Sequence, residues 1–190
     1  MLQNGDVLAG SANAHTLAIQ YRTGETSLDD LLERIAAGLG GRKAAVIGIG
    51  SHHSGENAFY LTGREVVSLG STLSGTAQQD FWKKLGTHIA AGGRIDLLAC
   101  NLARGDKGAL LISALQSTTG LSFAASTDAT GNPAFGGNWL LETASVDVRD
   151  IYFAEPAIGR FSGVMAQWDS QTKLVASAFG FWTQLIRSRR

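Results

Sequence analysis

Two chemically reactive side chains follow directly on apolar stretches of this sequence. Cys100 is the only cysteine and ends the stretch 94–99, and His52, with its neighbour His53, follows the stretch 44–51. In an open α/β sheet, ligands bind in the crevice outside the carboxyl ends of the strands. If the two stretches are such strands, a thiol lies beside an imidazole that can take its proton. This pairing predicts a nucleophilic site made of Cys100 and a histidine.

A nucleophilic cysteine depends on its surroundings to ionise the thiol and to stabilise the oxyanion. The thiolate is the reactive form, and a free thiol with a pKa near ~8.5 is only slightly ionised at neutral pH. A neighbouring histidine stabilises the thiolate, and attack on a peptide carbonyl also needs backbone N–H groups where the oxyanion forms. Glycine-rich turns suit that role because the backbone can approach a substrate closely. Such turns follow both predicted strands, as Ser54-Gly55 and as residues 101–105.

The elements that position these residues alternate between strands and helices. Leucine and isoleucine at helical spacing after Ser27 predict a first helix, and further helices begin at Thr76 and at about Gly108. Residues 54–75 suggest a hairpin or an irregular excursion. Alternating strands and helices imply a mainly parallel sheet covered on both sides, so we expect an α/β fold. The predicted strands cover residues 16–21, 44–51, 94–101, 121–126 and 138–142.

The pattern changes near the C-terminus. We expect a domain over residues 1–160 and a basic, aromatic helical tail over residues 161–190, with an apolar face from about residue 171. Three interpretations are open: a terminal helix packed on the sheet, a helix that binds a protein partner or a second copy, and a helix on a membrane surface. The basic residues stand mostly after the helix, which disfavours membrane contact. The apolar face consists of Leu174, Ala178, Phe179, Trp182, Leu185 and Ile186.

Composition excludes several classes of protein. A chain of 190 residues buries a full core without disulfides, and one cysteine permits neither an intrachain disulfide nor a multi-cysteine metal site. The formal net charge is zero, so composition gives no reason to expect a nucleic-acid partner. The four histidines lack metal-ligand spacing, and Gly48 and Gly50 lack the third glycine of a dinucleotide site, so we expect neither metal nor cofactor.

The location of the protein is less constrained. The sequence shows no signal-peptide pattern and no apolar run of the ~18 residues that a membrane span needs. A single free thiol survives in a reducing cytosol, although this does not prove a cytosolic location. We therefore expect a cytoplasmic protein or one that is exported by a signal-independent route.

The middle of the chain carries a series of short motifs: Ile95-Asp96-Leu97-Leu98-Ala99-Cys100-Asn101-Leu102-Ala103, Gly108, Thr119-Gly120, Ala124-Ala125-Ser126-Thr127-Asp128, Thr130-Gly131 and Gly136-Gly137-Asn138-Trp139-Leu140-Leu141-Glu142. This pattern resembles the DUF4347 family, a bacterial domain often found in large surface or secreted proteins, over about residues 44–143. In that family a Ser-His-Gly strand end precedes a Cys-Asn-x-Ala strand end. The family in turn resembles caspase-like (clan CD) cysteine peptidases, so the resemblance implies a caspase-like sheet and a His/Cys dyad.

Carried over residue by residue, the resemblance makes His52 the general base and Cys100 the nucleophile. This chain reads Ser51-His52-His53 where the family pattern has Ser-His-Gly. In that pattern the backbone N–H of the glycine helps to form the oxyanion hole. Three alternatives follow: the His53 side chain crowds the substrate and the site is inactive, Gly55 supplies the N–H instead, or His53 is the base.

A further candidate follows the strand at 121–126. In a parallel sheet Asp128 lies on the same edge as Cys100, where it either helps to select a basic side chain in a substrate or forms the turn before Thr130. Two functions are compatible with these observations. The first is a cysteine peptidase or self-processing protease that uses the His/Cys dyad. The second is a catalytically inactive binding or structural module of a larger bacterial surface or secreted assembly, docked through its C-terminal helix.

Overall fold

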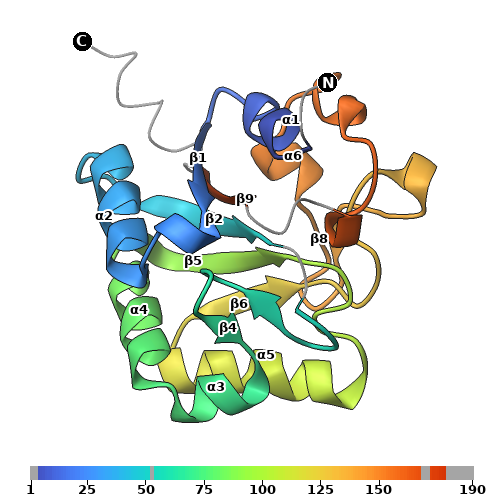
Figure 1. Cartoon of the computed structure of the whole chain (residues 1–190). Helices are drawn as coiled ribbons and strands as arrows, with labels where there is room; N and C mark the ends of the chain where they lie inside the picture. Colours follow the sequence, from blue (N-terminus) through green and yellow to red (C-terminus); the bar gives the residue numbers. More distant parts are fainter. Residues whose placement is uncertain (1–3, 52–53, 168–171, 179–190) are drawn as a thin grey trace.

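A five-stranded sheet lies at the centre of the computed structural model, which describes residues 4–51, 54–167 and 172–178 (Figure 1). The strand order is β1-β9-β2-β5-β6. β2, β5 and β6 are parallel neighbours, so the predicted α/β fold with a parallel sheet is confirmed. The strands are β1 (Thr16–Arg22), β2 (Ala44–Gly50), β5 (Ile89–Leu98), β6 (Ser122–Ala125) and β9 (Thr172–Ala178).

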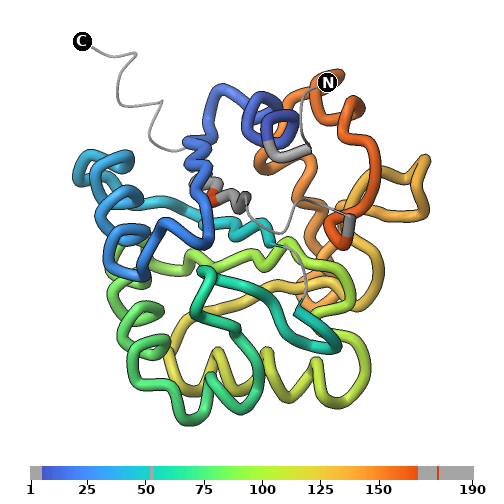
Figure 2. Tube along the Cα trace, viewed as in Figure 1, coloured from blue at the N-terminus to red at the C-terminus, as the bar shows by residue number. Residues whose placement is uncertain are grey.

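Helices cover both faces of this sheet, and the chain trace shows the strands in the middle of the molecule (Figure 2). One face packs against α2 (Leu28–Leu39), α4 (Thr76–Gly86) and α5 (Gly105–Thr119), and the other against α1 (Asn4–Gly10) and α6 (Arg149–Tyr152). Among the described residues, none of the helices has the length and apolar character needed to cross a membrane. The short elements are α3 (Leu69–Ser74), β3 (Phe59–Tyr60), β4 (Val66–Val67), β7 (Leu140–Leu141), β8 (Val146–Asp147), and the 3₁₀ helices η1 (Thr23–Glu25), η2 (Pro133–Phe135), η3 (Ile158–Arg160) and η4 (Met165–Gln167).

Local sequence signals set the ends of α2, the helix that leads into β2. Ser27 forms a capping box with Asp30, since the Asp30 N–H donates to Ser27 Oγ and the Ser27 N–H donates to the Asp30 carboxylate, each at 3.1 Å. Gly40 ends the helix in the left-handed conformation, with φ of 57°. The chain therefore enters β2 at a defined point, which in turn fixes where β2 ends.

Side chains alternate between two cores along the central strands. Ile95 and Leu97 point toward the core beneath α2, α4 and α5, whereas Leu98 and Cys100 belong to the core beneath α1 and α6. Successive side chains of a strand point to opposite faces, so every second position from Asp96 to Cys100 shares one face. This alternation directs the thiol toward the core beneath α1 and α6, which we call the second core, rather than toward solvent.

The C-terminal segment does not form the helix that the sequence predicts. Residues 172–178 form β9, which lies antiparallel between β1 and β2, with Val175 completely buried. Backbone hydrogen bonds to two neighbouring strands and burial of Val175 outweigh the helical spacing of the apolar residues, because tertiary packing overrides local preference. Residues 161–167 and 172–178 are therefore part of the domain rather than a helical tail. The remainder of the predicted helix, residues 179–190, lies outside the described residues.

Candidate functional site

The carboxyl ends of β2 and β5 meet in register, as the predicted site requires. Gly50 at the end of β2 is paired with Leu98 at the end of β5. Cys100 follows two positions after this pair. The two histidines of the predicted site, His52 and His53, lie outside the described residues, so the dyad remains a prediction.

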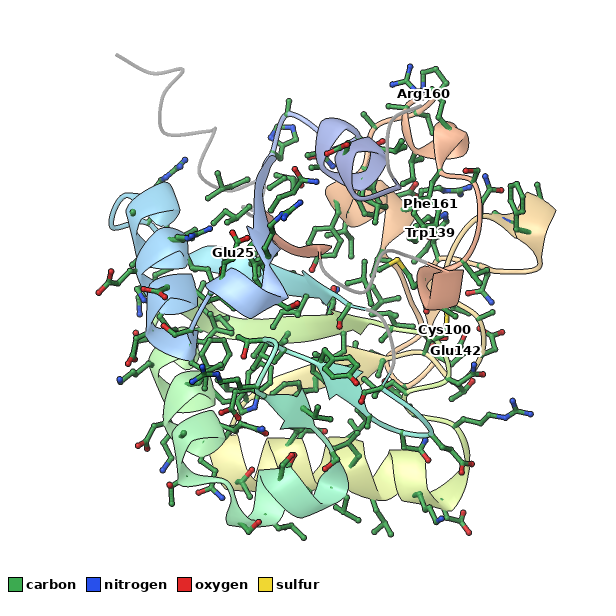
Figure 3. All side chains as sticks on the ribbon, in the orientation of Figure 1. Glu25, Cys100, Trp139, Glu142, Arg160 and Phe161 are labelled. Atoms are coloured by element: carbon green, nitrogen blue, oxygen red, sulfur yellow. The ribbon has the colours of Figure 1, made fainter. Side chains whose placement is uncertain are left out.

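Cys100 is buried in the second core. Its relative exposure is 2%, and it belongs to the same cluster as Trp139, Phe161 and Met165. Figure 3 shows Cys100, Trp139 and Phe161 on one side of the molecule, beyond the ends of the central strands. A substrate reaches this thiol only if the residues that cover it move.

Several backbone groups contact the sulfur of Cys100. The Ala166 N–H donates to Sγ at 3.3 Å, and the thiol donates to the Thr130 carbonyl oxygen at 3.6 Å. Burial raises the pKa of the Cys100 thiol, and backbone hydrogen bonds, including those of Ala166, Thr130 and Met165, counter part of that rise. The thiol is therefore protonated at neutral pH in this arrangement, and it needs a base before it can act as a nucleophile.

We call residues 163–166, which lie over the thiol, the cover segment; its last two residues, Met165 and Ala166, belong to the 3₁₀ helix η4. It runs antiparallel to residues 130–132: Val164 forms a bridge with Gly131, the Met165 N–H donates to the Thr130 carbonyl at 2.8 Å, and the Asn132 N–H donates to the Gly163 carbonyl at 3.0 Å. The pairing holds the cover segment across the sulfur. The carbonyl oxygen of Thr130 thus accepts hydrogen bonds from both the Cys100 thiol and the Met165 N–H of the cover segment.

The chain turns sharply directly after Cys100. Asn101 has a positive φ of 56°, a conformation that asparagine tolerates better than most residues. Its N–H donates to the carbonyl oxygen of Asp128 at 2.6 Å. The end of β6 is thereby tied to the residue next to the thiol, and the backbone of Asp128 lies on the same edge of the sheet as Cys100.

The carboxylate of Asp128 holds its own loop together. It accepts hydrogen bonds from the Asn138 side-chain amide at 2.9 and 3.1 Å and from the Ser126 hydroxyl at 3.1 Å. Both donor groups are neutral, and the Asp128 side chain is exposed. These contacts account for Asp128 as a turn residue, while its part in substrate selection remains a prediction.

The loop after β2 is fastened to the loop after Cys100. The Asn57 side-chain amide donates to the carbonyl oxygens of Leu102 at 3.0 Å and Arg104 at 2.9 Å, and Asn57 is itself buried. Gly55, the alternative oxyanion residue, lies in an exposed turn of the same loop with φ of 109°. The residues that follow the histidine pair are therefore held against those that follow the cysteine.

A buried charged group supports the second core beneath Cys100. Asp96 is completely buried and accepts hydrogen bonds from Arg94 Nε at 2.7 Å and from the Tyr152 hydroxyl at 2.9 Å. Burial raises the pKa of the Asp96 carboxyl, and the hydrogen bonds from Arg94 and Tyr152 counter this rise. Gly48 on β2 leaves room for the Tyr152 ring, since a β-carbon there would lie 2.8 Å from Cζ. The group ties α6 to β5 and so helps to position the core around the thiol.

A surface cleft lies apart from these residues. It has a volume of about 580 Å³ and is lined by residues 23–30 and 62–65. Of the predicted site residues that the structure describes, Gly55, Cys100 and Asp128, none lines this cleft.

Comparison with known families identifies the family of the chain. A family model described as a domain of unknown function, DUF4347, matches residues 2–165. The chain belongs to the DUF4347 family. The DUF4347 match includes both strand ends and most of the cover segment, whereas β9 lies beyond it. No curated protein and no solved structure matches the chain.

The covering of the thiol in this DUF4347 domain is not apparent from the sequence. The contacts of Cys100 with Thr130 and Ala166 join residues 30 and 66 positions apart, and no local periodicity reports contacts of that range. A weak local signal is the density of glycines after β6. A β-carbon at Gly131 or Gly137 would lie 2.6 or 2.8 Å from the nearest atom of the cover segment, so glycine permits its close approach.

Proposed function

We propose that this DUF4347 domain is a bacterial cysteine peptidase of the caspase-like class, with Cys100 as nucleophile and His52 as general base. The observation that supports the proposal most strongly is the position of the cover segment. Its residues 163–165 pair with residues 130–132 through their backbone, and the Ala166 amide lies 3.3 Å from the Cys100 sulfur. A thiol that a peptide backbone can reach, at the carboxyl edge of a parallel sheet, suits peptide hydrolysis.

The proposed reaction follows the usual course for a thiol nucleophile. His52 takes the proton of Cys100, and the thiolate attacks the carbonyl carbon of the peptide while the electron pair moves onto the carbonyl oxygen. Backbone N–H groups stabilise that oxyanion, with Gly55 as one candidate donor. Collapse of the tetrahedral intermediate expels the amine, which takes the proton from the histidine. Water then hydrolyses the thioester and restores the thiol.

A different observation favours a second function. Cys100 has a relative exposure of 2%, and burial raises the pKa of its thiol, as expected of a cysteine that only fills a core. On this interpretation the domain is a catalytically inactive binding or structural module of a larger bacterial surface or secreted assembly. The two functions differ in whether a histidine changes the ionisation of the thiol.

The pH dependence of alkylation separates the two functions. The rate at which iodoacetamide modifies Cys100 is measured by intact mass from pH 5 to pH 10. Burial slows the reaction and raises the pKa of the thiol, whereas a histidine that stabilises the thiolate lowers that pKa, so the midpoint of the profile reports which effect dominates. The peptidase predicts a midpoint well below the ~8.5 of a free thiol, and His52→Ala should raise it to that value or above.

His53→Ala is the matched control, because it removes the same chemical group from the adjacent position. If His52 is the base, the midpoint of His53→Ala stays at that of the native chain. A shift in His53→Ala alone assigns the base to His53 and overturns the role given to His52. A native midpoint at or above that of glutathione, unchanged in both variants, overturns the peptidase and leaves the inactive module.

A further inference from the structure

We propose that the cover segment occupies the peptide-binding groove of the Cys100 site and competes there with substrate. The inference rests on the proposed function and adds the class of ligand that the groove takes. That ligand is a peptide whose backbone pairs antiparallel with residues 130–132, as residues 163–165 do, and that places an apolar side chain beside Cys100. The domain as it stands is therefore a latent form of the enzyme.

The backbone pairing is the first support for this inference. The Met165 N–H to Thr130 carbonyl bond of 2.8 Å and the Asn132 N–H to Gly163 carbonyl bond of 3.0 Å flank the antiparallel bridge between Gly131 and Val164. Peptides that add to an exposed strand edge use the same main-chain bonds, which gives affinity for many sequences. Residues 130–132 thus form an edge that the chain fills with its own backbone.

The side chain of Met165 supplies the second support. It is completely buried and lies in the same apolar cluster as Cys100, Trp139 and Phe161. The space that it fills accepts an unbranched apolar side chain next to the sulfur. An aspartate or a lysine in that space would lose its hydration without a charged partner among the residues of this cluster.

The contact geometry makes the cover segment an obstacle rather than a substrate. The Ala166 N–H is directed at Cys100 Sγ at 3.3 Å. An N–H lies in the plane of its peptide group, whereas a thiolate attacks the carbonyl carbon from above or below that plane. The carbonyl carbon of Met165 is one C–N bond of about 1.33 Å from this nitrogen, and it does not present its face to the sulfur. The Met165–Ala166 bond is therefore held out of line for cleavage.

The cover segment is anchored on both sides. Before it, the Asn132 side-chain amide donates to the carbonyl oxygen of Phe161 at 2.6 Å, and Phe161 is completely buried. After it, β9 is inserted between β1 and β2. β9 lies beyond the match to the family model, which ends at residue 165. The element that holds the cover segment from its C-terminal side is therefore outside the part of the chain that the family model describes.

Gly131→Ala in the full chain tests the inference. A β-carbon at Gly131 would lie 2.6 Å from Val164 Cα and 2.7 Å from the Gly163 carbonyl oxygen, so the cover segment must move. Gly136→Ala is the matched control, because Gly136 also has a positive φ, of 80°, but an added β-carbon there meets nothing within 4 Å. We expect iodoacetamide to modify Cys100 about tenfold faster or more in Gly131→Ala, and at close to the native rate in Gly136→Ala, because local opening limits the reaction.

A second variant keeps the test valid if Gly131→Ala fails to fold. Asn132→Asp removes the amide that donates to Phe161 but keeps the Oδ1 that accepts from the Ala134 N–H at 2.9 Å. We expect it to raise the alkylation rate at an unchanged far-ultraviolet circular dichroism spectrum. Native alkylation as fast as that of the unfolded chain, or folded variants that all react at the native rate, overturns the inference.

The two proposals fail in different ways. Faster alkylation in Gly131→Ala, with a profile midpoint at or above ~8.5 and no effect of His52→Ala, supports the role of the cover segment and overturns the peptidase. A low midpoint that depends on His52, together with equal alkylation rates in Gly131→Ala and Gly136→Ala, supports the peptidase. The same result overturns the proposal that the cover segment occupies the peptide-binding groove.

Discussion

Replacing Cys100 with serine or alanine tests the contacts of the buried thiol. The sulfur lies 3.3 Å from Ala166 N and 3.6 Å from the Thr130 carbonyl oxygen. The C–O bond is shorter than the C–S bond, so a serine oxygen withdraws from both partners and is left buried without a good hydrogen bond, which costs about 1–3 kcal/mol. Alanine removes one buried heavy atom and adds no polar group, a change that costs about 0.5–1.5 kcal/mol by comparison with Ile→Val.

The free energy of unfolding should therefore fall in the order native, Cys100→Ala, Cys100→Ser. The serine variant loses the contacts that alanine loses and also buries a hydroxyl, so its total cost is about 1.5–4.5 kcal/mol. Urea unfolding measures the difference, and each 1 kcal/mol corresponds to roughly 2–4 °C in Tm for a chain of this size. A serine variant as stable as the alanine variant would mean that water reaches position 100, which contradicts its burial by the cover segment.

Three further predictions concern the groups that support the site. Tyr152→Phe removes the hydroxyl that donates to Asp96 at 2.9 Å and should lower the free energy of unfolding at pH 7 by about 1.5–3 kcal/mol in urea titrations. Because burial raises the pKa of Asp96 above 3.8, its unfolded form ionises first, so stability falls as pH rises from 3.8 through the raised pKa. This pH-dependent loss of stability should be absent in Asp96→Asn. An equal loss in the native chain and in Asp96→Asn would refute its attribution to the Asp96 carboxyl. Asn57→Asp places a carboxylate against two carbonyl oxygens of the loop after Cys100, which should lower Tm and the alkylation rate attributed to the dyad; unchanged values would show that this loop contact does not position the site.

Much of the sheet is predictable because its signals are local. The apolar run at 44–50 is buried on both faces, and the capping box at Ser27 and the left-handed glycine at Gly40 bracket the preceding helix. The parallel pairing of β2 with β5 follows from their order along the chain. For the same reason the sequence predicts that the ends of β2 and β5 meet, and hence where the candidate site lies.

β9 and the cover segment depend on contacts that sequence periodicity does not report. Residues 172–178 carry apolar side chains at helical spacing, yet two neighbouring strands supply the partners that make them a strand. The burial of Cys100 depends on residues 66 positions away. One local clue was present, because Asp96 shares a face with Cys100, and a charged residue inside an apolar strand indicates a covered face with its own polar partners.

The most direct test of the account is labelling of Cys100 by a peptide that copies the cover segment. N-acetyl-Gly-Val-Met chloromethyl ketone carries the sequence of residues 163–165, and the thiolate displaces its chloride to form a C–S bond. Incubated with Gly131→Ala, it should give one adduct at Cys100 about tenfold faster or more than the matched Gly-Val-Asp probe, because an aspartate loses hydration in the apolar space of Met165. The rate should fall in the Gly131→Ala/His52→Ala double variant. Equal labelling rates for both probes, unaffected by His52→Ala, would contradict the proposed peptide-binding groove. They would also contradict the role of Cys100 as a nucleophile activated by His52.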